Sequence, residues 1–241
     1  MIEAAISKIL SLRPVETLQI NGHTYTTSAV HRVASPEEAF TRPLVFTTLT
    51  GLVDFYNSAE DGALADDLIK SYFHIENPRS VVLVGDPMGP SNERPTYAGS
   101  VYDENTYRFG DWTEIDMFII ALMTQFVETE DSKMLMSYLG NLSDEHVKER
   151  VDDGVSVTLT VKTGITTKSQ VTITNPVNLA PYATFTEIDQ PSRPFILRTR
   201  SHGDDVQVGL FAADGNKWQA EAIQRIKKFL NDKLPEACVL A

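Results

Sequence analysis

The pattern that most limits the fold of this chain begins at Gly154. Between Val155 and Lys162 apolar residues alternate with Ser, Thr and Lys, and the same two-residue period returns between Val171 and Thr174. Successive side chains of a β-strand point to opposite faces, so this period gives each strand one apolar and one polar face. A sheet with one buried and one solvated face is usually antiparallel. The second half of the chain therefore predicts an antiparallel sheet.

Three other segments have helical periodicity. Apolar residues recur every three or four positions in 49–56, 115–126 and 218–230, so each segment predicts an amphipathic helix. Residues 111–114 predict the start of the middle helix, because Asp111 is a good N-cap residue and an acid follows three residues later. The inward residues expected of that helix are Ile115, Phe118, Ile119, Leu122, Met123 and Phe126. The fold class is therefore α+β, with an antiparallel sheet, largely from the C-terminal half, packed with several helices.

Shorter signals predict the remaining elements. Asn21-Gly22 stands between two alternating runs, which is the strongest short-range signal of a β-hairpin. The apolar run 81–84 ends at a glycine and predicts a buried strand. The other expected elements are a helix at 63–73, two helical pieces at 132–139 and 143–151 separated at Gly140-Asn141, a strand around Phe185, and a frayed C-terminal tail that contains Cys238.

The length and the charge distribution bear on the domain organisation. A chain of 241 residues can bury a full core, so we expect one α+β domain over 1–241. A candidate sub-boundary lies near residue 154, between an acidic helical part (1–153) and a β-rich part with the final helix (154–241). The net charge of −12 is uneven: residues 51–154 hold 21 acids and 7 bases, whereas residues 155–241 hold 8 acids and 10 bases.

Composition excludes several classes of protein. An isoelectric point near 4.8 disfavours direct nucleic-acid binding, because neutralising phosphates requires clustered Lys and Arg. The most apolar window, 117–123, is far shorter than the ~18–20 residues that cross a bilayer, so no membrane partner is expected. The single cysteine, Cys238, cannot form an internal disulfide or a Cys-based zinc site. These observations predict a soluble protein of a reducing compartment, the cytoplasm.

No segment carries a catalytic motif. Residues 85–90 follow an apolar run as a phosphate loop would, but they lack the Lys-Ser/Thr of a P-loop. Residues 103–114 match a calcium loop at its first, third and last positions, but Arg108 stands where the loop needs glycine. The five histidines are scattered along the chain. We therefore predict no catalytic residue, no metal site and no cofactor.

Five basic residues of the second half are the candidate site. They are Arg193, Arg198, Arg200, Lys162 and Lys168, which form a candidate anion- or partner-binding surface. Alternation places Arg198 and Arg200 on the same face of a strand. With Tyr182, Phe185 and Phe195 nearby, such a surface would bind a nucleotide or a single strand by stacking and charge. The favoured alternative is that these cations pair with the acidic part of the same molecule or of a neighbour.

Several segments carry a resemblance to a known family. They are Phe46-Thr47-Thr48-Leu49-Thr50-Gly51-Leu52-Val53-Asp54-Phe55-Tyr56-Asn57, the stretch from Tyr107-Arg108-Phe109 to Phe126-Val127-Glu128, the Thr-rich alternating hairpin after Gly154, and the run Val206 to Phe211 before the Lys-rich last helix. In outline they cover most of the chain, and they resemble an uncharacterised family of bacteriophage and prophage proteins that includes enterobacterial YfdQ. The resemblance implies a phage or prophage product that acts in the bacterial host cytoplasm or is carried in the virion. It supplies no catalytic residues.

Three classes of function remain open at this point. The first is a non-catalytic phage accessory protein that binds a protein partner or assembles with itself as a homo-oligomer; the absence of a catalytic motif and the charge asymmetry favour it. The second is an acidic decoy or inhibitor of a host nucleic-acid or defence enzyme, in which carboxylates imitate phosphates. The third is a metal- or nucleotide-dependent enzyme whose residues converge only in three dimensions.

Overall fold

The computed structural model of this chain describes residues 17–20, 23–26, 42–59, 70–88, 92–104, 106–143, 150–152, 156–163, 167–202 and 205–241. The chain divides into two compact units, residues 1–41 and 42–241. In the first unit, β1 (Thr17–Ile20) pairs antiparallel with β2 (His23–Thr26). This pairing confirms the hairpin predicted around Asn21-Gly22.

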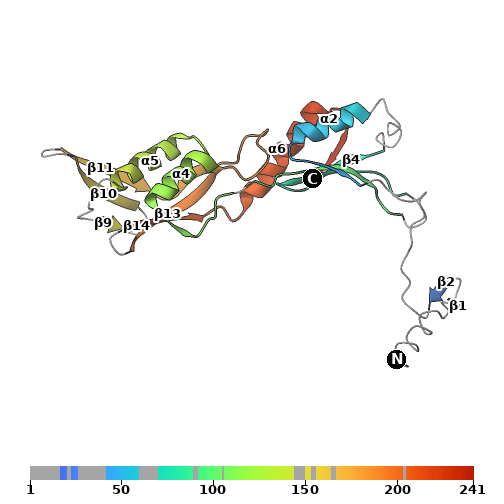
Figure 1. Cartoon of the computed structure of the whole chain (residues 1–241), viewed down its shortest axis with the longest axis horizontal. Helices are drawn as coiled ribbons and strands as arrows, with labels where there is room; N and C mark the ends of the chain where they lie inside the picture. The colour runs from blue at the N-terminus through green and yellow to red at the C-terminus, as the bar shows by residue number, and fades with distance from the viewer. Residues whose placement is uncertain are drawn as a thin grey trace, which may run out of the picture. The chain divides into compact units, whose positions relative to one another are not determined.

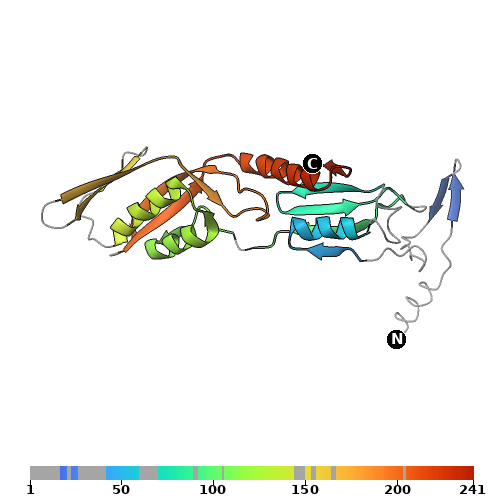
Figure 2. The same cartoon turned by 90° about the horizontal axis from the view of Figure 1, so that it is seen from above.

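Five strands of the second unit form the first sheet, in the order β15-β4-β5-β6-β3. They are β3 (Leu44–Phe46), β4 (Tyr72–Asn77), β5 (Ser80–Val84), β6 (Thr96–Val101) and β15 (Cys238–Leu240). The three central strands are antiparallel, whereas the edge strands β3 and β15 run parallel to β6 and β4. Helices α2 (Leu49–Ala59) and α6 (Lys217–Lys233) cover one face of this sheet (Figures 1 and 2).

The first core fills the space between this sheet and its two helices. The periodicity of 49–56 and 218–230 is confirmed, because residues at that spacing in α2 and α6 are buried. Alternate residues of the central strands face them, as the pleat of a strand requires. Fully buried residues of this core include Leu49, Leu52, Phe73, Leu83, Phe185, Ile226 and Leu230.

Five further strands form the second sheet, in the order β7-β14-β13-β12-β8, and all of its pairings are antiparallel. They are β7 (Trp112–Glu114), β8 (Phe126–Val127), β12 (Val177–Pro181), β13 (Arg193–His202) and β14 (Asp205–Ala212). The helices of this part are α4 (Ile115–Gln125) and α5 (Glu130–Ser143). A three-stranded sheet contains β9 (Arg150–Asp152), β10 (Ser156–Thr163) and β11 (Thr167–Thr174). Helices with mostly antiparallel sheets confirm the α+β class.

The second core takes residues from both sides of residue 154. Phe118 in α4 and Leu135 in α5 are fully buried together with Phe195 in β13 and Leu210 in β14. Residue 154 therefore does not separate two cores. All members of the second core lie between residues 107 and 210, whereas the first core uses residues before and after this segment and only Phe185 and Ile188 from within it. The second core is thus an insertion within the chain that forms the first.

Helix boundaries near the second core differ from the prediction. The helix start expected at 111–114 is wrong, because residues 112–114 form β7, which pairs with β14, and the helix begins at Ile115. The break expected at Gly140 is also wrong, because α5 runs through it. Residues 150–152 form a strand instead of ending a helix, and 144–149 lie outside the described residues.

Strands of the first sheet account for two more corrections. The expected helix at 63–73 is wrong at its end, because Phe73 pairs with Leu83 in β4; residues 60–69 lie outside the described ranges. Cys238 belongs to β15 and not to a frayed tail, since the adjacent Val239 is buried and pairs with Phe73. Four of the five strands of this sheet come from the first half of the chain. Within the described ranges, the acidic part is therefore not mainly helical.

The loop 182–192 between β12 and β13 connects the two cores. Phe185 and Ile188 are buried in the first core, although the strands on either side belong to the second sheet. The strand expected at Phe185 is therefore wrong. Its ring instead packs against Tyr102, with 6.1 Å between ring centroids.

The buried side-chain amide of Gln190 organises this loop. Its Oε1 accepts hydrogen bonds from the backbone N–H groups of Ala183 and Thr184, at 3.0 and 3.3 Å. Its Nε2 donates to the carbonyl oxygens of Thr184, Phe185 and Ile188, at 3.3, 3.0 and 3.3 Å. Buried backbone groups need such partners, and this one side chain supplies them to five backbone groups of a loop that belongs to no sheet.

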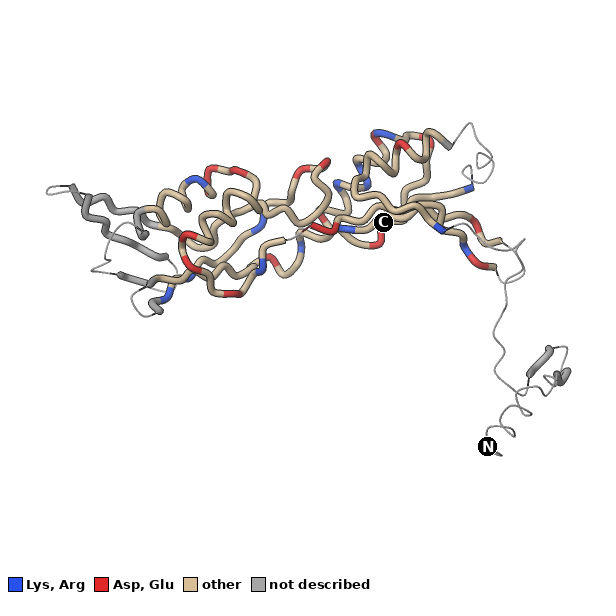
Figure 3. Tube along the Cα trace, in the orientation of Figure 1, with Lys and Arg blue, Asp and Glu red and all other residues tan. Residues whose placement is uncertain are grey.

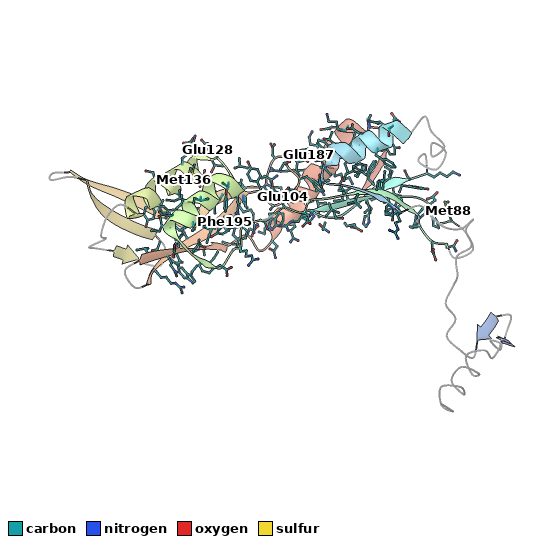
Figure 4. The ribbon with its side chains drawn as sticks, in the orientation of Figure 1. Met88, Glu104, Glu128, Met136, Glu187 and Phe195 are labelled. Atoms are coloured by element: carbon teal, nitrogen blue, oxygen red, sulfur yellow. The ribbon has the colours of Figure 1, made fainter. Side chains whose placement is uncertain are left out.

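Glu187 attaches the same loop to α2. Its carboxylate accepts a hydrogen bond from the backbone N–H of Thr50, at 3.0 Å, in the first turn of the helix. The first N–H groups of a helix have no partner inside it and carry partial positive charge, which a carboxylate stabilises. Glu187 lies beside α2 in Figure 4. The loop therefore has a polar contact as well as apolar contacts with the first core.

Candidate functional site

The five basic residues singled out in the sequence occupy three different places. Arg198 and Arg200 lie on the outer face of β13, on the same side of the strand as alternation predicts, whereas Arg193 is on the buried side. Lys162 in β10 stands directly opposite Lys168 in β11, in a different sheet. The structure therefore brings Arg198 and Arg200 to one face but separates Arg193 from them.

Arg193 binds Asp214 inside the chain. Only 4% of its surface is exposed. Its Nε and Nη2 donate to the two carboxylate oxygens of Asp214, at 3.1 and 3.3 Å. The guanidinium carbon also lies 5.2, 5.1 and 5.0 Å from the ring centres of Phe109, Phe195 and Trp218. Ring faces attract cations, and more strongly away from water, so this arginine is engaged entirely within the protein.

Asp214 connects the end of β14 to the start of α6. Its carboxylate accepts hydrogen bonds from the backbone N–H groups of Asn216 and Trp218, at 3.3 and 3.4 Å. Burial acts to raise the pKa of Asp214, but the hydrogen bond and charge of Arg193, with these two N–H groups, outweigh it and hold the pKa below its ordinary value. The charged pair therefore holds α6, which belongs to the first core, against the second sheet.

A cation–aromatic cluster lies on the outer face of the second sheet. The guanidinium carbon of Arg200 is 4.4 Å from the ring centre of Trp112 in β7. Its Nε and Nη2 both donate to Oε1 of Gln207 in β14, at 3.0 and 2.8 Å. Trp112 in turn packs edge-on against Phe211, with 5.9 Å between ring centroids. Side chains from three adjacent strands thus meet on one partly exposed face.

The aromatic members of this cluster are not those expected from the sequence. Phe185 and Phe195 are fully buried in the two cores, so their rings are not available to stack on a bound ligand. Phe195 lies in β13, in the second core, in Figure 4. Alternation along β14 places Phe211 on the same face as Gln207, a signal present in the sequence. Trp112 was missed because its segment was assigned to a helix start.

Glycine is required at position 209, beneath these rings. A Cβ there would lie 2.9 Å from Cε2 of Phe211 and 3.2 Å from Cε3 of Trp112. We expect Gly209→Ala to lower the free energy of unfolding by about 1–3 kcal/mol, because both rings must move. The matched control is Gly140→Ala in α5, where a Cβ meets nothing within 4 Å. This control should raise the free energy by about 0.5–1 kcal/mol. Urea unfolding measures the change in the free energy of unfolding of both variants. A Gly209→Ala protein as stable as the parent would contradict the close packing of Phe211 and Trp112 over Gly209.

Helix α4 has apolar residues on both of its sides. Its inner side packs into the second core through Phe118 and Leu122, which are buried. On its outer side Met117, Ile120 and Met123 recur three residues apart and are 56%, 53% and 68% exposed. We call these three residues the α4 outer stripe; the inward position predicted for Met123 is wrong. No helix in the described part of the chain, α4 included, is long and apolar enough to cross a bilayer.

The outer face of the first sheet, opposite α2 and α6, also carries exposed apolar residues. One row of this face crosses all five strands, from Leu240 through His74, Val82 and Gly99 to Val45. The residues at its two ends, Leu240 and Val45, are 46% and 68% exposed. Both edge strands therefore present apolar side chains to solvent.

Carboxylates are spread over both sheets and their helices (Figure 3). Within the described ranges, no three His, Cys, Asp or Glu side chains lie close enough together to hold a metal ion. No known protein family, no curated protein and no solved structure matches this chain.

Proposed function

We propose that this chain is a non-catalytic accessory protein of a bacteriophage or prophage, and that it acts in the host cytoplasm or in the virion by binding a protein partner or by self-assembly. The observation that carries the proposal is the α4 outer stripe, to which Val45 and Leu240 add exposed apolar side chains at the two edges of the first sheet. Large apolar side chains grouped on one face mark a surface that associates with another molecule.

The composition of α4 supports this proposal. Nearly every residue from Ile115 to Met123 is apolar, and a helix that is apolar all round is normally buried all round. The second core covers only one side of it. Each Å² of apolar surface removed from water contributes ~25 cal/mol, so covering the stripe would stabilise an assembly.

The contacts of the carboxylates favour partner binding over an acidic decoy. A decoy needs unpaired carboxylates in a phosphate-like row, whereas several acids of the described residues bind groups of the same chain. Such internal pairs join Glu128 and Glu130 to Lys133, Asp131 to the N–H of Asn178, Glu187 to the N–H of Thr50, Glu221 to Arg225, and Asp232 to Lys228.

Light scattering of the purified chain over a range of concentrations, at low and high salt, tests the proposal. We expect a mass that rises with concentration, or one protein that co-purifies in fixed proportion from the producing cells. Replacing Val45 and Leu240 by Thr and the α4 outer stripe by Gln should abolish either result, because these changes remove the exposed apolar surface. A chain that stays monomeric and alone, or association that the substitutions leave intact, would contradict the proposal.

A further inference from the structure

We infer that the α4 outer stripe is the docking surface for a basic amphipathic helix of a partner protein. This inference rests on the proposed function and names the chemistry of the partner. Met117, Ile120 and Met123 form one continuous row along the outer side of α4, and all three are more than half exposed. Two of them are methionines, whose flexible side chains adapt to the shape of an incoming apolar surface.

The charge around this row points to a cationic partner. Residues 111–135, which contain α4 and the first turns of α5, hold six acids and one base. That base, Lys133, lies 2.9 Å from Glu128 and 3.5 Å from Glu130, so its charge is already compensated. Glu128 and Glu130 remain 69% and 93% exposed despite this contact. An apolar row between acidic ends is complementary to a helix with an apolar side and flanking Lys or Arg.

The same charge disfavours a second copy on this surface. In a two-fold dimer the same patch lies on both sides of the interface, so acids such as Glu114 and Asp116 of one copy would lie close to acids of the other. Like charges brought together across an interface cost several kcal/mol unless cations separate them. A basic helix supplies those cations, whereas another α4 does not.

The geometry favours a helix over an extended segment. Backbone groups of α4 are used inside the helix, so no strand can add to it and only side-chain packing is available. The hydroxyl of Thr124, beside the row, donates to the carbonyl of Ile120 at 2.8 Å and so leaves no unmet donor at the surface. Residues spaced three apart form a ridge that fits between the ridges of a second helix.

A fluorescent peptide of Leu and Lys, about 14 residues long with its Leu residues at helical spacing, provides the test. The control peptide has the same composition in an order that destroys the apolar side. Fluorescence anisotropy gives the affinity of each peptide for the full chain and for the Met117→Gln/Ile120→Gln/Met123→Gln variant. Gln keeps the side-chain length of Met and a high helix propensity, and circular dichroism verifies that the variant is folded.

We expect the parent chain to bind the amphipathic peptide at least about tenfold more tightly than it binds the scrambled peptide. The Gln variant should bind the amphipathic peptide at least about tenfold more weakly than the parent chain does. The matched control, Val45→Thr/Leu240→Thr, removes apolar surface from the first sheet and should change the affinity for the amphipathic peptide less than about twofold. Equal affinity of the parent chain for both peptides would overturn the inference, and so would a Gln variant that binds the amphipathic peptide as tightly as the parent chain does. A parent dimer that becomes monomeric in the Gln variant without binding peptide would also overturn it, by identifying a second copy as the occupant, while still supporting the proposed function.

Discussion

Replacing Arg193 with alanine is expected to lower the free energy of unfolding by about 3–5 kcal/mol. The side chain of Asp214 is 6% exposed in the parent chain, and the substitution leaves its carboxylate charged with no cation beside it. It also removes the cation that lies among Phe109, Phe195 and Trp218. Urea unfolding followed by tryptophan fluorescence measures the loss.

Two controls separate the buried charge from a general effect of removing arginine. Arg200→Ala removes an exposed arginine of the same strand and should cost less than about 1 kcal/mol. Arg193→Met combined with Asp214→Asn removes both charges and keeps similar volumes, so it should recover much of the stability lost in Arg193→Met alone. If Arg193→Ala costs no more than Arg200→Ala, the buried pair does not stabilise the fold.

The same pair makes stability depend on pH in one direction. The pKa of Asp214 is lower in the folded chain than in the unfolded chain, so its contribution is fully present above the ordinary pKa of 3.8 that the unfolded chain has. That contribution is lost as the pH falls through the lower, folded pKa. The Arg193→Met/Asp214→Asn variant should therefore lose less stability on acidification than the parent.

Phe185→Ala is expected to produce a loss of similar size, about 3–5 kcal/mol, because it empties a fully buried site in the first core. The side chain comes from a loop, so its loss also weakens the attachment of the second sheet to that core. Phe55→Ala is the matched control, since Phe55 is only partly buried against the same core. Urea unfolding and the rate of proteolysis within 182–192 measure the two effects. Equal losses in both variants, with equal proteolysis, would show that Phe185 has no special role.

Elements with a strong local period were predictable from the sequence. Residues 156–163 and 167–174 pair along their whole length as alternation indicated, and 217–233 form the predicted final helix. In each of these segments the apolar residues recur at the period of one strand face or one helix face, so the segment's own sequence indicates whether it is a strand or a helix.

Elements that depend on distant pairing were not predictable. Residues 112–114 have the composition of a helix start, but they form a strand because they pair with β14, about a hundred positions later. Cys238 to Leu240 form a strand only because β4 offers an edge. Phe185 has no local period and is buried because Gln190 fixes the loop around it.

The candidate site was predicted in part for the same reason. Alternation placed Arg198 and Arg200 on one face correctly, but it did not distinguish the buried Arg193, whose partner is 21 residues away in the chain. Trp112 required the pairing of β7 with β14 before its ring could be placed near Arg200. The exposure of the α4 outer stripe was not predictable from the sequence, because apolar residues of an amphipathic helix normally face the core.

The nesting of one core within the chain of the other sets an order for biosynthesis. Residues 107–210 leave the ribosome before α6 and β15, so the inserted half can complete its packing while the surrounding half still lacks a helix and an edge strand. Until α6 emerges, the apolar side of β4 that it will cover is open to water and to other nascent chains. Of the two cores, the surrounding one is therefore the more exposed to misassembly during translation.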